Sequence, residues 1–498
     1  MRVDVVALAV IGAIGASITP GAAQVLSPGT GAPNDIWQNG TSPTPGIYAA
    51  RQTPNVQPTT AAQPVGSQQT NTPPQGTQGF PFNGGTFYSG VTVGSFYDDN
   101  VFAAHTNKLH DWAFFARPEA LLVQQGQDYT FTADGWAEGR AYDHFSSEDQ
   151  VNAGTGATFT ETPDNNTQLV GGVRYIHEHL DRGSSETVVA LPGGGAQLLS
   201  TLFSHPVAYD EGLATFALNK RYGNWWSSIG VAGLDIEYQN ANIAPGTPIL
   251  GSTAVDFSYA DGGIATANGR VGYVVAPLTS VFVDITGNTR AWHVGYFDST
   301  GYRIVGGMLF EQGPGARLKG EIWAGYMDQR YSGITLQNVA SWTFGLSMAA
   351  LITDDVTAVF EGHREAKEAA LGLAALSSGA LGATAPTCIA DVAVCVSDIE
   401  STIGGRLDYR ILRNVVVGGG VTYQEDDYQG PLSFGRIDHS LGPLASVKWF
   451  ATPNLTLGFD YRNLSFSSGG GFAPAPFTPV TALSYNKNVY LVSATARW

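Results

Sequence analysis

Beyond its amino-terminal segment, the sequence has no continuous apolar run of the roughly 20 residues that a helical membrane span needs. Basic residues are also scarce, since 25 Lys and Arg stand against 42 Asp and Glu and give a formal net charge of -17. Such an acidic chain is a poor partner for a phosphate backbone, so nucleic acid is not an expected ligand. Only two cysteines are present, Cys388 and Cys395. In an oxidising compartment they are predicted to form a local disulfide, because the neighbourhood offers too few ligands for a metal site.

Common catalytic motifs are missing as well. The sequence has neither the GxSxG motif around the nucleophilic serine of serine hydrolases nor the HExxH motif of metalloproteases. His177 and His179 share a strand face with Val173 and Tyr175, which indicates a position at the membrane interface and not a metal site. His363 lies near a predicted strand end, and the sequence reveals no partner for it. We therefore expect no enzymatic activity, no cofactor and no metal ion.

The amino terminus has the pattern of a secretion signal. Arg2 precedes an apolar run over residues 5–18, and small residues at 21–23 suit a signal peptidase, so residues 1–23 are predicted to be removed after Sec-type export. Residues 24–83 are rich in Pro, Gln and Thr and have few apolar or charged side chains. Such a segment buries too little apolar surface to offset its ordering entropy. It is predicted to be a disordered periplasmic tail, with a tether to peptidoglycan or to a partner as the alternative.

From Gly84 to Trp498 the sequence alternates between strand-length segments and two kinds of connection. Short, turn-like connections are predicted at residues 125–127, 162–165, 220–223, 276–278, 313–315, 353–354, 412–414 and 451–454. Longer connections are predicted at residues 99–110, 143–148, 182–204, 239–254, 293–298, 332–336, 367–396, 429–433 and 467–483. The short connections are predicted to be periplasmic turns and the longer ones outer loops, and this division predicts about eighteen strands. Sixteen is the alternative, if the segments near 223–239 or 299–311 are wrongly divided.

The last segment shows the strand period most clearly. One face carries Tyr490, Val492, Ala494, Ala496 and Trp498, and the other carries Ser493, Thr495 and Arg497. A final strand that is apolar on one face and ends on an aromatic residue is typical of the closing strand of a bacterial outer-membrane barrel. The predicted fold is an all-β, transmembrane, antiparallel up-and-down β-barrel with both termini in the periplasm. Outer-membrane lipid, lipopolysaccharide and the barrel-assembly machinery are its predicted partners.

Strand alternation also assigns charged side chains to the barrel interior. The predicted pore-lining residues are Arg117, Glu119, Asp134, Glu138, Arg140, Arg174, Arg270, Asp284, Asp460, Arg462 and Arg497. Basic and acidic side chains on opposed walls would select solutes by charge. Alternatively, these charges pair across neighbouring strands and merely fill the lumen.

Two features are predicted at the outer strand ends. The first is an acidic rim that comprises Asp98, Asp99, Asn100, Glu425, Asp426 and Asp427. Its oxygen atoms would either hold divalent cations that bridge to lipopolysaccharide or simply be solvated. For residues 98–100 a further alternative is that they end a strand by local hydrogen bonds between side chain and backbone. The second is residues 363–381, whose Ala, Leu, Glu and Lys content favours a helix. This helix would either narrow the mouth or cap the surface.

Several segments resemble the putative β-barrel porin 2 family of Gram-negative outer-membrane proteins. They are GVTVGSFYDDNVF (90–102), RPEALL (117–122), residues 216–221, YFDSTGYRIVGG (296–307) and GEIWAGYMDQRYSG (320–333). The most specific element is YDDNVF at 97–102, and the insert near 366–396 departs from the family pattern. The resemblance spans nearly all of residues 84–498, implies an outer-membrane barrel and brings no catalytic residues.

The function predicted from these observations is a porin-like channel for passive diffusion of small hydrophilic solutes. The alternative is a closed barrel with a structural or surface-interaction role, serving for instance an envelope polysaccharide. A homo-oligomer is compatible with either function.

Overall fold

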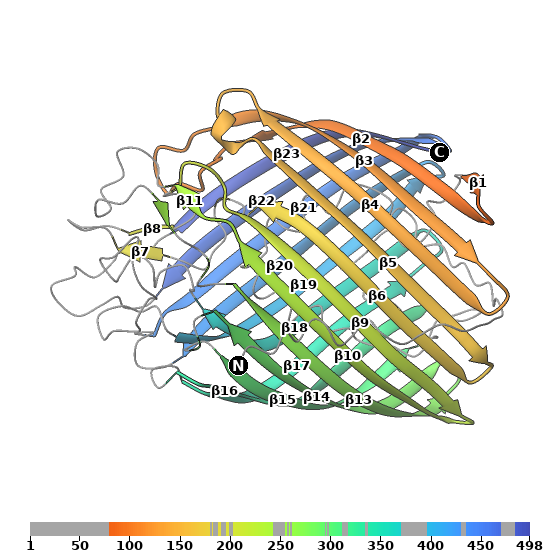
Figure 1. Ribbon diagram of the computed structural model, residues 1–498. Coiled ribbons are helices and arrows are strands. Elements are labelled where there is room, and N and C mark those ends of the chain that lie inside the picture. The colour runs from red at the N-terminus through yellow and green to blue at the C-terminus, as the bar shows by residue number, and fades with distance from the viewer. Residues whose placement is uncertain are drawn as a thin grey trace.

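The computed structural model describes residues 79–179, 182, 188–190, 196–198, 203–242, 254–255, 258, 261–293, 295, 298–310, 317–333, 337–369, 396–429, 435–469 and 484–498. In this part of the chain, 18 strands form one closed antiparallel barrel (Figure 1). Each strand of the barrel pairs with the next one along the chain, and β2 (Gly85–Asp98) pairs with β23 (Ser484–Arg497) to close the ring. The predicted all-β barrel fold and its strand number are confirmed.

The strands of the barrel are similar in length, from 12 residues in β15 to 17 residues in β19. Between β2 and β23 they are β3 (Asp111–Gln125), β4 (Tyr129–Tyr142), β5 (Gln150–Asp164), β6 (Thr167–His179), β9 (Ala208–Tyr222), β10 (Trp225–Tyr238), β13 (Gly262–Ala276), β14 (Thr279–Trp292), β15 (Ser299–Phe310), β16 (Leu318–Tyr331), β17 (Val339–Leu351), β18 (Val356–Ala369), β19 (Val396–Leu412), β20 (Val415–Gln429), β21 (Ile437–Thr452) and β22 (Leu455–Gly469). Short additional strands are β1 (Phe80–Phe82), β7 (Val188–Ala190), β8 (Ala196–Leu198), β11 (Ala241–Asn242) and β12 (Ala254–Val255).

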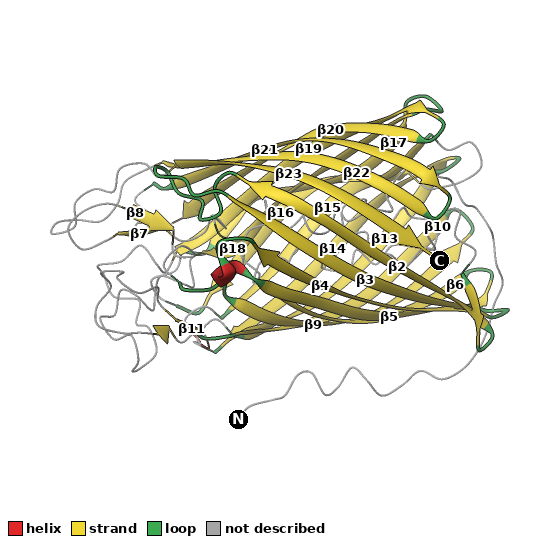
Figure 2. Cartoon of the chain, turned by 90° about the horizontal axis from the view of Figure 1, so that it is seen from above, coloured by secondary structure: helices red, strands yellow, loops and turns green. Residues whose placement is uncertain are grey.

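Short and long connections lie at opposite ends of the barrel. Two-residue turns such as 223–224 and 453–454 lie at the end that holds the carboxyl terminus (Figure 1). The 3-10 helix η3 (Ser146–Glu148), drawn in red in Figure 2, lies at the other end, where the strands run into the longer connections. The sequence placed the breaks between strands close to these positions because turn residues and longer polar segments alternate along the chain. Which end faces the periplasm stays a prediction.

The two faces of the barrel wall differ in chemistry, as the closing strand β23 illustrates. Its outward side chains are exposed, with Val492 at 60% and Trp498 at 46%, whereas Thr495 on the inner face is 3% exposed. Large apolar side chains are exposed in the same way on the other strands, for example Ile229 at 62%. Within the described residues, no helix combines the length and the apolar character of a membrane span.

Apolar side chains occupy parts of the inner face. Phe96, Phe115 and Leu491 are buried together, on strands that flank the closing seam between β2 and β23. Trp226 and Leu309 belong to a second cluster, on strands β10 to β16. The interior is therefore a mixture of polar walls and apolar clusters.

One prediction about secondary structure is wrong. Residues 363–369 belong to strand β18, which pairs with β19 from Val356 opposite Tyr409 to Ala369 opposite Val396. Helix propensity is a weak preference per residue, and cross-strand pairing along the whole of β18 overrides it. The remainder of the predicted helix, and the predicted disulfide between Cys388 and Cys395, lie outside the described residues.

Candidate functional site

Strand register places the predicted pore-lining residues on the inner face of the barrel. Arg270 and Asp284, for example, stand directly opposite each other on β13 and β14 and are each 1% exposed. Six members of the set are only half-buried, namely Glu119, Asp134, Arg140, Arg174, Asp460 and Arg462. The inner face is thus strongly charged, and the role of these residues in an open passage stays a prediction.

Strands β2, β3, β4 and β23 form what we call the paired wall, in which carboxylates meet cations. Glu138 Oε1 lies 2.5 Å from Arg140 Nε, and Glu138 Oε2 lies 3.7 Å from Arg117 Nη1. Glu119 Oε1 accepts a hydrogen bond from Arg497 Nε at 2.9 Å, which joins β3 to the closing strand. The Arg117 guanidinium also lies over the Trp136 ring, 4.2 Å from its centroid. In this wall the predicted charges pair with one another within β4, between β3 and β4, and between β3 and β23.

Arg270 is the centre of a second set of ion pairs, on β13, β14 and β16. Its Nε donates to Asp284 Oδ2 at 3.0 Å, and its Nη1 donates to Glu321 Oε2 at 2.7 Å. Thr286 Oγ1 donates to the other oxygen of Asp284 at 2.7 Å. Sequence analysis missed Glu321, because only the barrel register brings β16 within reach of β13.

Four carboxylates form a line across strands β18 to β21, which we call the carboxylate row. Glu365 stands opposite Glu400, Glu400 opposite Asp426, and Asp426 opposite Asp438. The last three are between 0% and 2% exposed, and the Glu365 side chain is 16% exposed. Directly opposed like charges destabilise a sheet, so this arrangement is unusual in an inner wall.

Polar neighbours moderate the charge of the carboxylate row at three points. Glu400 Oε1 lies 2.6 Å from His363 Nε2, and Gln424 Nε2 donates to Asp426 Oδ2 at 2.9 Å. At the other end of the row, Arg436 Nε donates to Asp438 Oδ1 at 3.0 Å. Of these residues, sequence analysis singled out only Asp426 and His363. Residue spacing within one strand gives no signal for a line that runs across four strands.

The predicted acidic rim is not a continuous solvated edge. Asp98, Asn100 and Asp426 are at most 2% exposed, so these three members of the set are buried. The reason is that their polar groups bond within the wall: Lys487 Nζ lies 2.6 Å from Asp98 Oδ2, and Asp98 Oδ1 accepts from the Asn100 backbone N–H at 2.9 Å. Glu425 and Asp427 are partly exposed.

Asp99 and Asn100 end strand β2 and connect it to the closing strand. Asp99 accepts hydrogen bonds from the backbone N–H and the side-chain amide of Asn488, each at 2.7 Å. Asn100 Nδ2 donates to the carbonyl of Asn486 at 3.0 Å. The interpretation of residues 98–100 as a strand end held by side-chain to backbone bonds agrees with this geometry.

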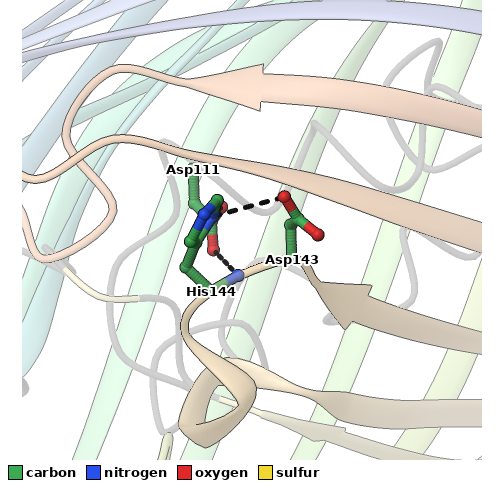
Figure 3. Close-up of side chains that lie close together, drawn as sticks. All are labelled: Asp111, Asp143 and His144. Carbon is green, nitrogen blue, oxygen red and sulfur yellow. Dashed lines mark hydrogen bonds and ion pairs between the residues drawn. The ribbon is translucent and has the colours of Figure 1, made fainter.

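A histidine and two aspartates meet at the barrel end with the long connections (Figure 3). His144 Nδ1 lies 2.9 Å from Asp111 Oδ1 and 3.3 Å from Asp143 Oδ2. The hydrogen bond with Asp111 and the nearby charge of Asp143 raise the pKa of the His144 imidazole above its ordinary value. Asp111 Oδ2 also accepts from the backbone N–H groups of His144 and Phe145, each at 2.9 Å. Both oxygens of Asp111 are thus engaged in holding the loop that follows β4.

Comparisons with known proteins support the barrel assignment. The family model described as putative beta-barrel porin 2 matches residues 73–385. No curated protein matches the chain.

Among solved structures, OpdO of Pseudomonas aeruginosa is similar over 83% of this chain and 98% of its own, with 12% identity and a TM-score of 0.40. The outer membrane protein opdK of the same organism is similar over 83% of this chain and 99% of its own, with 11% identity and a TM-score of 0.39. The siderophore receptor PirA, also from Pseudomonas aeruginosa, is similar over 82% and 80%, with 9% identity and a TM-score of 0.37.

Proposed function

The chain belongs to the putative beta-barrel porin 2 family, and from this premise we propose that it is an outer-membrane channel for passive diffusion of small hydrophilic solutes. The observation that carries the proposal is the closed ring of 18 antiparallel strands with apolar side chains outside and charged side chains inside. A ring of this size encloses a water-filled lumen unless it is plugged. Solutes would move down their own concentration gradient, and no cofactor would be needed.

The charges on the inner face support a preference for cations. In the paired wall, Arg117 and Arg140 neutralise Glu138, and Arg497 neutralises Glu119. The carboxylate row, in contrast, sets four acids at directly opposed positions of β18 to β21 and so gathers carboxylates on one side of the inner face. A negative wall concentrates cations and lowers their barrier to passage.

Single-channel recording on the refolded full-length protein in a planar bilayer tests this function. We expect stable conductance steps and, under a salt gradient, a reversal potential of the sign that cation preference gives. A correctly folded barrel without conductance would contradict the channel and favour a closed structural barrel. The inward clusters around Leu491 and around Trp226 are the observation that favours this second candidate, because they fill part of the interior.

The proposed location in the outer membrane has its own test in the closing strand. Trp498 joins the ring through two backbone hydrogen bonds with Ser89, from its N–H at 2.8 Å and to its carbonyl at 3.2 Å. Deletion of Trp498 should lower the yield of folded barrel in outer-membrane fractions, measured by heat-modifiable mobility on gels. Trp498→Phe keeps the backbone and an aromatic end and should assemble normally. Normal assembly of the deletion variant would contradict the proposed role of the closing strand in export and assembly.

A further inference from the structure

We propose that His363, Glu365 and Glu400 form a binding site for a divalent first-row metal ion of the Zn²⁺ type. The ligand atoms of the three side chains all lie within 4.8 Å of one another. His363 Nε2 is 2.6 Å from Glu400 Oε1 and 3.8 Å from Glu365 Oε1. One ion at the centre of this group would reach all three after small side-chain movements, because metal–nitrogen and metal–oxygen bonds are about 2.0–2.2 Å long.

The barrel backbone brings these ligands together. His363 and Glu365 are two residues apart on β18, so they lie on the same face of the strand. Glu400 on β19 stands directly opposite Glu365 and diagonally next to His363. Both strands are paired over this stretch, which fixes the three Cα positions on a rigid wall and not on a loop.

The donor set determines the class of ion. One imidazole nitrogen with two carboxylates suits Zn²⁺ and neighbouring transition metals and leaves positions open for water. Ca²⁺ and Mg²⁺ prefer shells made only of oxygen atoms. His363 therefore distinguishes this site from a general attraction of cations to acidic side chains.

A buried acceptor atom is a second, independent observation that fits a cation site. Glu365 Oε1 is buried, and no residue that the structure describes donates a hydrogen bond to it. A buried carboxylate oxygen without a donor is costly, and native structures rarely leave one in that state. A metal ion between Glu365 and His363 would complete its coordination.

The carboxylate row provides the electrostatic reason for an ion at this end. Glu365 and Glu400 are directly opposed, and Asp426 follows Glu400 in the row. Arg436 is bonded to Asp438 at the far end of the row. A dication bound next to Glu365 would offset the repulsion between the Glu365 and Glu400 carboxylates, because both would be attracted to the ion.

The cluster of Asp111, Asp143 and His144 has a similar composition and serves as an internal control. Its ligand atoms also lie within 4.8 Å of one another. However, donors already engage both oxygens of Asp111, and the Asp143 and His144 side chains are 58% and 73% exposed. A metal there would compete with the backbone N–H groups that hold the loop, whereas at His363 it would replace a contact between two of its own ligands, so we assign the site to His363.

The test is isothermal titration calorimetry, in which Zn²⁺ is added to the refolded, metal-stripped full-length protein in detergent and the heat of binding gives affinity and stoichiometry. We expect one ion per chain, and Co²⁺ at the same site should develop visible absorption typical of a nitrogen-containing ligand set. His363→Gln should weaken Zn²⁺ binding by at least about 10-fold, since even substitution of a residue that only hydrogen-bonds to a metal ligand has an effect of that size. Glu365→Gln should weaken it as well, and His144→Gln should bind like the wild type. Heat-modifiable mobility on gels verifies that each variant is folded.

Three outcomes would overturn the proposal. The first is the absence of stoichiometric Zn²⁺ binding to the folded wild type. The second is equal affinity in folded His363→Gln, or in folded Glu365→Gln if His363→Gln does not fold. The third is loss of binding in His144→Gln alone, which would place the ion at the loop cluster. Because these measurements need no conductance, a silent barrel would contradict the proposed channel and leave the metal site standing.

Discussion

The paired wall and the carboxylate row are built from the same residue types on the same barrel, yet their charges are arranged in opposite ways. In the paired wall, Glu138 lies between two arginines and Glu119 faces Arg497. In the carboxylate row, the residue opposite Glu400 is another acid on either side, Glu365 on β18 and Asp426 on β20. Side-chain type is therefore a poor guide to the role of an inward charge, because the residue opposite it decides whether that charge stabilises the barrel.

This difference separates structural from functional charges. The paired wall contains the closing seam, where Arg497 of β23 bonds to Glu119 of β3 across β2. Ion pairs at this position hold the two ends of the ring together. The carboxylate row lies away from this seam and places four acids at directly opposed positions of the inner face. Natural proteins keep locally unfavourable arrangements mainly at functional sites, which is why we place both the metal site and the cation preference there.

The largest expected effect comes from breaking the paired wall at its centre. Glu138→Gln removes the carboxylate that Arg117 and Arg140 share, and Glu138 is 1% exposed. Removal of one partner from a buried ion pair costs about 3–5 kcal/mol of folding stability. Denaturant unfolding of the refolded protein in detergent should show a loss of this order. Glu119→Gln is the matched control and should lose less, because Glu119 and Arg497 are 19% and 11% exposed. Equal losses would mean that burial does not distinguish the two pairs.

In the carboxylate row, replacement of an acid by its amide should stabilise the barrel, in contrast to the paired wall. Asp426→Asn removes one charge from between Glu400 and Asp438 and keeps an oxygen that accepts from Gln424. Relief of like-charge repulsion is expected to raise the free energy of unfolding by about 0.2–1 kcal/mol in metal-free buffer. Destabilisation of this variant would show that the row is already compensated within the wall.

Asp284→Asn is the matched control for that substitution. Asp284 is as buried as Asp426 but pairs with Arg270 at 3.0 Å. The same chemical change should therefore destabilise the barrel, since it leaves a buried guanidinium with one carboxylate fewer. A stabilised Asp284→Asn would remove the contrast between paired and opposed carboxylates.

A smaller effect is expected on ion selectivity in the proposed channel. Glu365→Gln should move the reversal potential under a salt gradient away from cation preference, because it removes charge from the negative wall. Arg462→Glu, on the inner face of β22, should move it the other way. A conducting Arg462→Glu variant with unchanged selectivity would take Arg462 off the list of residues that line the passage.

The sequence predicted the barrel and its connections because these depend on local patterns. The alternation from Tyr490 in β23 to Trp498, which directly follows this strand, is visible within a few positions of the chain, and so are the turn residues between strands. The face assignment of Arg270 and Asp284 follows from the same alternation. The barrel architecture was thus predictable without knowledge of the register between strands.

The candidate site was not predictable in the same way. Glu365, Glu400, Asp426 and Asp438 come from four strands, and a shift of one residue in any pairing would move them out of line. His363 had no visible partner in the sequence because Glu400 lies 37 positions further on. The misread helix has the same origin, since the composition of residues 363–369 favours helix while pairing with β19 requires a strand.

The smallest expected effect concerns the loop cluster at the end of the paired wall, where Asp111 has His144 as its cationic neighbour. Because the pKa of His144 is raised in the folded protein, its contribution to stability is fully present below the ordinary histidine value of about 6.5 and is lost as pH rises through the folded pKa. Unfolding midpoints of wild type and His144→Gln should therefore differ most near pH ~6 and converge by pH ~9. Asp143→Asn should reduce the pH dependence and keep the bond to Asp111. A difference that stays constant with pH would show that the imidazole acts as a neutral hydrogen-bond donor. The pairing of carboxylates with cations in the paired wall would then not extend to the loop that follows β4.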